Sequence, residues 1–139
     1  MAEPVRVAVL GLGRSGWGIH VTGLGDHPNY KVVAVADPEE ARRTEATQTY
    51  GCTAYESPEE AIADPNVELV VVATPSNSHA ALTIKALESG RHVVVEKPMA
   101  TNLAEADAMI EAAKNSGNIL SIYQVRRFDP EVQLSLIHI

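Results

Sequence analysis

A glycine-rich turn and an acidic residue downstream of it are the groups in this sequence whose types and spacing suggest a ligand. The turn, Gly-Leu-Gly-Arg-Ser-Gly at residues 11–16, directly follows an apolar run at residues 5–10, and a second apolar run ends on Asp37. Gly13 leaves its backbone open to a pyrophosphate, and Gly16 lets a following helix pack closely on the sheet. The N-terminus of that helix then binds the phosphate charge, and Asp37 accepts the hydroxyls of an adenosine ribose. This pattern predicts a dinucleotide-binding site.

Alternating strand and helix patterns surround these residues. The predicted strands occupy residues 5–10, 32–36, 52–55, 69–73, 92–95 and 119–123. The predicted helices occupy residues 14–24, 38–50, a short segment from Ser57, 78–89 and 102–115. Such alternation is typical of a parallel sheet with helices on both faces, and six strands in two halves favour a doubly wound α/β sheet in the order 3-2-1-4-5-6. Capping boxes are predicted at Ser57 with Glu60 and at Asn102 with Glu105.

The remaining polar motifs follow the predicted strands at one edge of this sheet. Thr74-Pro75 follows the fourth strand, Glu96-Lys97-Pro98 follows the fifth, and residues 124–128 follow the sixth. Ligands of doubly wound sheets bind beyond the carboxyl ends of the strands. We therefore expect these motifs to share one site with the glycine turn.

Charge and composition exclude several classes of partner. The chain of 139 residues has a formal net charge of −7 and no cluster of more than two Lys or Arg, so neither nucleic acid nor an anionic membrane is expected as a partner. No apolar stretch approaches membrane-spanning length, and no leader pattern precedes the first strand. Cys52 is the sole cysteine and is expected to be a small buried hydrophobe in a reducing compartment, so the chain is expected to be cytoplasmic. No metal site is expected.

Three motifs together resemble the Gfo/Idh/MocA family of NAD(P)-dependent oxidoreductases, which includes glucose–fructose oxidoreductase and inositol dehydrogenases. They are the glycine turn, Thr-Pro-Ser-Asn-Ser-His at residues 74–79, and Glu-Lys-Pro at residues 96–98. The two later motifs are more specific than the turn, which marks only the superfamily. Arg-Arg-Phe-Asp-Pro at residues 126–130 is similar to the family's crossing into a second domain. The resemblance extends over residues 5–130.

The resemblance implies a role for each matching residue. Lys97 is expected to be the catalytic residue, which contacts a substrate hydroxyl near the nicotinamide and shuttles its proton while hydride leaves the carbinol carbon. The expected cofactor contacts are Gly11, Leu12, Gly13, Arg14, Ser15, Gly16, Asp37, Thr74, Pro75, Asn77, His79, Glu96, Lys97 and Arg126. NAD is expected over NADP because Asp37 would repel a 2′-phosphate, while Arg42 and Arg43 are expected to lie along the following helix, away from the ribose.

Several of these residues have a second interpretation. Glu96 either contacts the nicotinamide ribose or only orients Lys97, which itself has the alternative of a solvated loop lysine. His79 either contacts the cofactor or only caps or packs its helix, and Arg126 either reaches the nicotinamide or substrate or is a surface arginine. Trp17 is expected to pack between helix and sheet, with cover of the dinucleotide as the alternative. Three further histidines are expected at structural or surface positions: His20, His27 and His92.

The expected organisation is a dinucleotide-binding domain at residues 1–123 and the start of a crossover at residues 124–133. A second α/β domain, which would close the substrate pocket, is expected to be missing. Residues 134–139, Leu-Ser-Leu-Ile-His-Ile, match the translation of a transposon-end sequencing adaptor and are excluded from the fold; a genuine helix start is the alternative.

The expected function is the cofactor half of an NAD-dependent oxidoreductase acting on a sugar, polyol or similar small alcohol. The full-length parent is expected to be a homo-oligomer, and the chain alone is expected to be inactive. A non-catalytic dinucleotide-binding module or sensor is the alternative.

Overall fold

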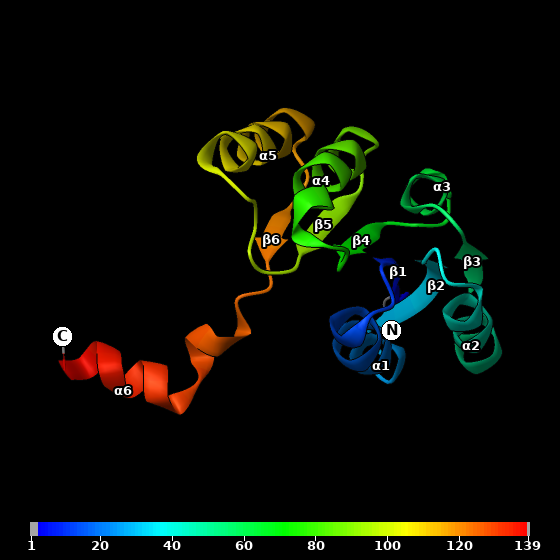
Figure 1. Ribbon diagram of the computed structural model, residues 1–139, viewed down its shortest axis with the longest axis horizontal. Helices are drawn as coiled ribbons and strands as arrows, with labels where there is room; N and C mark the ends of the chain where they lie inside the picture. Colours follow the sequence, from blue (N-terminus) through cyan, green and yellow to red (C-terminus); the bar gives the residue numbers. More distant parts are fainter. Residues whose placement is uncertain (1–2, 139) are drawn as a thin grey trace.

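The computed structural model describes residues 3–138 and shows a sheet between two layers of helices (Figure 1). Within these residues the strands are β1 (Val5–Leu10), β2 (Tyr30–Ala36), β3 (Thr53–Tyr55), β4 (Leu69–Val72), β5 (His92–Val95) and β6 (Leu120–Ile122). Their order across the sheet is β3-β2-β1-β4-β5-β6, and each neighbouring pair is parallel. The predicted doubly wound α/β fold and its strand order are therefore confirmed.

Helical segments connect the strands and cover both faces of the sheet. They are η1 (Gly16–Val21), α1 (Thr22–Gly25), α2 (Glu40–Tyr50), α3 (Pro58–Ala63), η2 (Ser76–Ser78), α4 (His79–Glu88), α5 (Leu103–Ser116), η3 (Val125–Phe128) and α6 (Pro130–His138). Helices α1 and α2 lie on one face, while α3, α4 and α5 lie on the other (Figure 1). No helix in residues 3–138 has the length and apolar character needed to cross a membrane.

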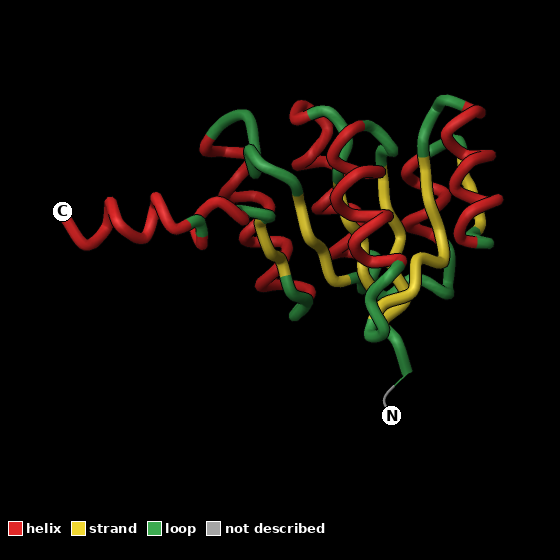
Figure 2. Tube along the Cα trace, turned by 90° about the horizontal axis from the view of Figure 1, so that it is seen from below, coloured by secondary structure: helices red, strands yellow, loops and turns green. Residues whose placement is uncertain are grey.

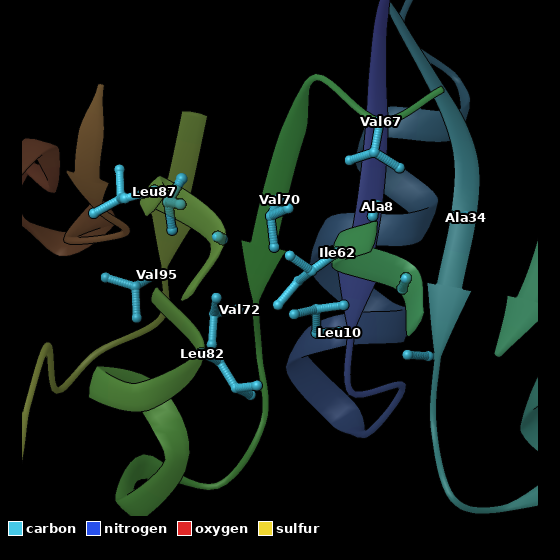
Figure 3. Close-up of a cluster of buried hydrophobic side chains, with 14 of the residues drawn as sticks. Ala8, Leu10, Ala34, Ile62, Val67, Val70, Val72, Leu82, Leu87 and Val95 are labelled. Carbon is cyan, nitrogen blue, oxygen red and sulfur yellow. The ribbon is translucent and has the colours of Figure 1, made fainter. Parts of the chain in front are cut away.

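Two apolar cores result from the alternation of side chains along the central strands. Val7 and Val9 of β1 pack in the core beneath α1 and α2, whereas Ala8 and Leu10 pack in the core beneath α3 and α4. Side chains of a strand alternate between faces, so a strand covered on both sides must be apolar throughout. Figure 3 shows the second core, in which Ile62 of α3 packs near Leu10 and Val70.

One predicted capping box forms completely and the other forms only in part. The Ser57 side chain accepts the Glu60 N–H, and the Glu60 side chain accepts the Ser57 N–H, both at 3.3 Å. Asn102 likewise accepts the Glu105 N–H at 3.0 Å. The Glu105 carboxylate, however, turns to Thr101, which offers it both a backbone N–H at 2.9 Å and a hydroxyl at 2.7 Å. The backbone hydrogen bond from Thr101, with the hydroxyl adding to it, lowers the pKa of Glu105.

The helix after the glycine turn differs from the prediction of one regular helix over residues 14–24. Residues 16–21 form a π-helix, η1, before the chain returns to α-helical geometry in α1. In the π segment the Thr22 N–H donates to the Trp17 carbonyl, five residues back. A π turn holds more residues than an α turn, so it rotates the following side chains. Here the rotation buries His20 and Val21 against the sheet.

The chain leaves the sheet after β6. Segment η3 and helix α6 run away from the body of the fold, as both views show (Figures 1 and 2). The crossing region carries apolar surface, because Ile122, Val125 and Phe128 are all exposed, the last at 77%. Helix α6 is continuous through residues 130–138, and residue 139 lies outside the described residues. The adaptor interpretation of residues 134–139 stays a prediction.

Candidate functional site

Two cavities lie along the carboxyl ends of the strands and meet at the glycine turn. The first, of about 470 Å³, is lined by the turn together with Asp37, Thr74 and Pro75. The second, of about 690 Å³, lies beside Glu96, Lys97 and other residues after β5 and β6. Arg14 and Ser15 line both cavities, so an elongated ligand that crossed the turn would enter both. Volumes of this order are typical of small-molecule sites.

The three glycines of the turn differ in whether a side chain would fit. Gly11 and Gly16 leave no room for a Cβ, whereas Gly13 does. Gly11 has a φ of +85°, and a Cβ there would lie 2.8 Å from the carbonyl oxygen of Ala73. A Cβ on Gly16 would overlap the Gly11 carbonyl, so this glycine allows the helix to begin close to the turn. A Cβ on Gly13 would meet no protein atom within 4 Å, and Gly13 lines the first cavity. Its missing side chain therefore leaves space for a ligand.

Asp37 connects the end of β2 to the glycine turn. Its carboxylate accepts the Leu12 N–H at 2.7 Å through Oδ2 and the Glu39 N–H at 2.9 Å through Oδ1, and the residue is only 3% exposed. These bonds hold the carboxylate at the rim of the first cavity. A carboxylate can accept about four hydrogen bonds. Because Arg42 Nη1 also donates to Oδ2 at 3.4 Å, about one acceptor position remains for a ribose hydroxyl.

Arg42 and Arg43 are expected to lie along the following helix, away from the ribose, but both side chains turn back to the end of β2. Arg42 Nη1 lies 3.4 Å from Asp37 Oδ2, and Arg43 Nη1 donates to the carbonyls of Asp37 and Pro38 at 2.8 and 2.9 Å. Both arginines are in the first turn of α2, and helical side chains tilt toward the N-terminus of their helix. They consequently reach back over the end of β2, and Arg42 lines the first cavity.

The loop after β4 brings only part of its motif to the cavities. Thr74 and Pro75 line the first cavity, and the Thr74 hydroxyl lies 2.7 Å from the Ser78 hydroxyl. Ser78 in turn donates to the Pro75 carbonyl at 2.7 Å, which fixes the loop. Asn77 is exposed and is not among the lining residues of either cavity, so the structure does not place it with the other candidate contacts.

His79 points into the protein and not into a cavity. It is 1% exposed, with Nδ1 2.8 Å from the Pro98 carbonyl and Nε2 2.8 Å from the Thr74 carbonyl. A neutral imidazole donates to only one of two carbonyls, whereas an imidazolium donates to both. This placement argues against the expected direct contact with a cofactor. His79 instead joins the loop after β4 to the loop after β5.

The Glu96-Lys97-Pro98 segment contains a cis peptide between Lys97 and Pro98 and a buried carboxylate. Glu96 is 5% exposed, and its Oε2 accepts the Lys97 N–H at 3.1 Å. Its Oε1 lies 2.9 Å from Nε2 of His20, a buried residue of η1. Of the two interpretations of Glu96, the geometry matches the one in which it orients Lys97. Lys97 itself is exposed and lines the second cavity.

His20 is expected at a structural or surface position, and the structure buries it. The sequence gave no signal for its contacts: the ring lies against Glu96 and packs edge-to-face on Tyr123, with 4.7 Å between ring centroids. His20 lies in the π-helix η1, whereas the sequence predicted a regular helix there. His27 and His92 are exposed, as expected.

The remaining candidates lie at the edges of the site. Trp17 packs edge-to-face on Tyr50, with ring centroids 6.0 Å apart, which matches its expected packing role. Arg126 lines the second cavity, but its side chain is 88% exposed and pairs with Asp129 at 3.1 Å. Within residues 3–138 no three His, Cys, Asp or Glu side chains are grouped as they would be around a metal ion.

Known proteins resemble the chain over nearly its whole length. A family model described as an oxidoreductase family with an NAD-binding Rossmann fold matches residues 5–124. The scyllo-inositol 2-dehydrogenase (NAD(+)) of Bacillus subtilis is 39% identical over 94% of the chain and 38% of its own length. The scyllo-inositol 2-dehydrogenase (NADP(+)) of the same organism is 33% identical over 91% of the chain and 35% of its own length. The chain therefore spans less than two fifths of these relatives.

A solved structure shows the same arrangement of elements. The crystal structure of GenD2 from gentamicin A biosynthesis, determined in complex with NAD, superposes with a TM-score of 0.89 at 31% sequence identity. The match covers 99% of this chain and 39% of the GenD2 chain.

Proposed function

Because the chain belongs to the oxidoreductase family with an NAD-binding Rossmann fold, we propose that its two cavities together bind one nicotinamide dinucleotide. The observation that carries this proposal is their meeting at Arg14 and Ser15 of the glycine turn. The adenosine ribose would be held by Asp37, the pyrophosphate by the turn, and the nicotinamide half beside Lys97. The open space at Gly13 supports this fit, since a phosphate needs close access to the backbone there.

We propose that the chain is the cofactor-binding part of a longer dehydrogenase acting on a sugar, polyol or related small alcohol. The names of two relatives as scyllo-inositol 2-dehydrogenases support this substrate class. The bound nicotinamide supplies the hydride chemistry. Lys97 is the residue of this chain that would hold the substrate oxygen and move its proton, because its amine lies beyond the end of β5 and at the cavity.

We propose that NAD is preferred over NADP, by a margin that Arg42 narrows. The Asp37 carboxylate accepts a ribose hydroxyl and repels a 2′-phosphate, whereas an arginine beside the ribose can accommodate that phosphate. Arg42 Nη1 lies 3.4 Å from Asp37 Oδ2, so both groups would face the same ribose. The existence of an NAD(+)-named and an NADP(+)-named relative is consistent with a cofactor choice that depends on few side chains.

We also propose where the protein is located and how the longer protein assembles. The single cysteine supports a cytoplasmic location, and a homo-oligomer is proposed for the longer protein.

The proposed site is tested by substituting Gly13 with Val. The Cβ of the new side chain would meet no protein atom within 4 Å, and the side chain would fill the space that the pyrophosphate needs, so Gly13→Val should fold normally and lose NAD⁺ binding. Isothermal titration calorimetry measures the affinity, and a thermal melt checks the fold. Gly23→Ala is the matched control, because a Cβ there also meets nothing within 4 Å but Gly23 lies in α1, outside both cavities. Retained NAD⁺ affinity in Gly13→Val would place the cofactor elsewhere.

A further inference from the structure

His20 and Glu96 form a buried pair beside the second cavity. Nε2 of His20 lies 2.9 Å from Oε1 of Glu96, and each residue is 5% exposed. Burying a carboxylate is costly unless it is paired and hydrogen-bonded. The contact with His20 therefore offsets the cost of burying the Glu96 carboxylate. Glu96 precedes the exposed Lys97, and both residues line the second cavity.

Glu96 of this pair is also hydrogen-bonded to the backbone of Lys97. The second oxygen of Glu96, Oε2, accepts the Lys97 N–H at 3.1 Å. His20 also packs edge-to-face on Tyr123, the residue that follows β6. One imidazole ring thus joins three segments that are far apart in sequence: the π-helix η1, the end of β5 and the end of β6. Glu96, Lys97 and Tyr123 line the same cavity, so the ring fixes part of its wall from behind.

We propose that His20 is a positioning residue for the nicotinamide half of the site, acting through Glu96 on Lys97. This inference rests on the proposed function. His20 holds the Glu96 carboxylate, the carboxylate holds the Lys97 amide, and the amide sets where the Lys97 side chain starts. Without the histidine, Glu96 keeps a single polar contact and can rotate toward water, which releases Lys97 from its fixed position.

The test uses two amide variants that differ by one methylene group. In His20→Gln the side-chain N–H₂ can reach the position of Nε2 and donate to Glu96, whereas in His20→Asn it is too short to do so. Titrations compare NAD⁺ with ADP-ribose, which lacks the nicotinamide. His20→Asn should bind NAD⁺ about tenfold more weakly, the scale of one hydrogen bond to a charged group, and ADP-ribose less than twofold more weakly. His20→Gln should recover most of the NAD⁺ affinity.

His27→Gln is the matched control, because His27 is an exposed histidine before β2 and lines neither cavity. It should leave both affinities unchanged. A merely structural His20 would lower the melting temperature without changing the ratio of the two affinities. Equal weakening of NAD⁺ and ADP-ribose in His20→Asn, or no recovery in His20→Gln, would overturn the inference while leaving the proposed function intact.

Amide hydrogen exchange gives a second measurement that needs neither a ligand nor a folded variant. In the unchanged chain the Lys97 amide should exchange at least tenfold more slowly than a free amide, because its N–H donates a hydrogen bond to Glu96. Exchange at the unprotected rate would overturn the inference even if His20→Asn failed to fold. If the unchanged chain bound neither NAD⁺ nor ADP-ribose, the proposed function would fail, and a protected Lys97 amide would show that the positioning contacts exist apart from it.

Discussion

Lys97 lies between the second cavity and a third cavity next to it. It lines the cavity shared with Glu96 and Tyr123, and also a neighbouring one of about 640 Å³ formed with Pro98 and Ile122. An amine at this boundary can face a cofactor on one side and a small alcohol on the other. General acid–base catalysis requires such proximity to the proton that moves.

We expect Lys97→Ala to affect chemistry more than cofactor affinity. In the longer dehydrogenase proposed above, kcat should fall by about 10²–10⁴, the range for loss of a positioned acid–base group. NAD⁺ affinity should fall by about tenfold at most, the same scale as in His20→Asn, because the turn and Asp37 hold the other half of the dinucleotide. Steady-state kinetics and titration measure the two effects, with Lys85→Ala on the exposed side of α4 as the control. A near-normal kcat in Lys97→Ala would remove Lys97 from the mechanism and leave Glu-Lys-Pro as a structural turn.

Cofactor choice should change in opposite directions in two neighbouring variants. Asp37→Ala removes the carboxylate and should weaken NAD⁺ about tenfold while relaxing the discrimination against NADP⁺. Arg42→Ala removes the cation 3.4 Å from that carboxylate and should weaken NADP⁺ more than NAD⁺. Competition titrations give the affinity ratio in each case, and Asp26→Ala, at an exposed position after α1, is the control. A ratio that moved the same way in both variants would contradict the assigned roles.

At the scale of the elements, most strands could be predicted because their patterns do not depend on distant parts of the chain. The run Leu69–Val72 is apolar at each position and must be covered on both faces, and Ser57 with Glu60 caps a helix through local bonds. The π-helix η1 could not be predicted in this way. It contains His20, whose contact with Glu96 joins residues 76 positions apart in the chain.

The orientation of site side chains was also beyond the sequence pattern. The motifs correctly predicted that the segments after the strands lie at one edge of the sheet. They did not indicate whether a given side chain faces a cavity or the protein interior. His79 points inward, where two loop carbonyls lie 2.8 Å from its ring nitrogens. Arg42 points toward Asp37 because of its place in the first turn of α2. Such choices are made by hydrogen-bond partners that only the folded chain brings near.

His79 should therefore matter for stability at the junction of two loops. His79→Phe keeps a buried ring but removes the nitrogens that lie 2.8 Å from the carbonyls of Thr74 and Pro98, and a buried carbonyl that loses its donor costs about 1–3 kcal/mol. We expect a loss of about 2 kcal/mol in the free energy of unfolding, measured by urea denaturation. The exposed His27→Phe should change stability by less than about 0.5 kcal/mol. An unchanged urea midpoint in His79→Phe would show that the contacts of the His79 ring nitrogens contribute nothing to stability.

At the scale of the whole molecule, the proposed cofactor site and the core around Cys52 are built from the same elements, β2 and α2. Asp37 and Arg42 lie at the junction of β2 and α2, while Cys52 lies just after α2 in the core formed with Val9 and Val35. Any opening that exposes Cys52 must separate α2 from the sheet. The same opening would disrupt the wall of the first cavity, so ligand binding and exposure of the cysteine should exclude each other.

Thiol labelling of Cys52 should therefore report on the opening of the whole fold. Burial raises the pKa of the thiol above its ordinary value of 9.0, and the group donates to the Ala46 carbonyl at 3.6 Å, so the native chain should react far more slowly than a free cysteine. A pKa raised by folding contributes stability that is fully present below pH 9.0 and is lost as the pH rises toward the folded value. Labelling should consequently keep accelerating above pH 9.0, where the rate of a small-molecule thiol levels off. NAD⁺ at 100 times its Kd should slow labelling by about 100-fold, because binding competes with opening. Labelling that ignored NAD⁺ would show that Cys52 becomes exposed through a local motion that leaves the cofactor site assembled.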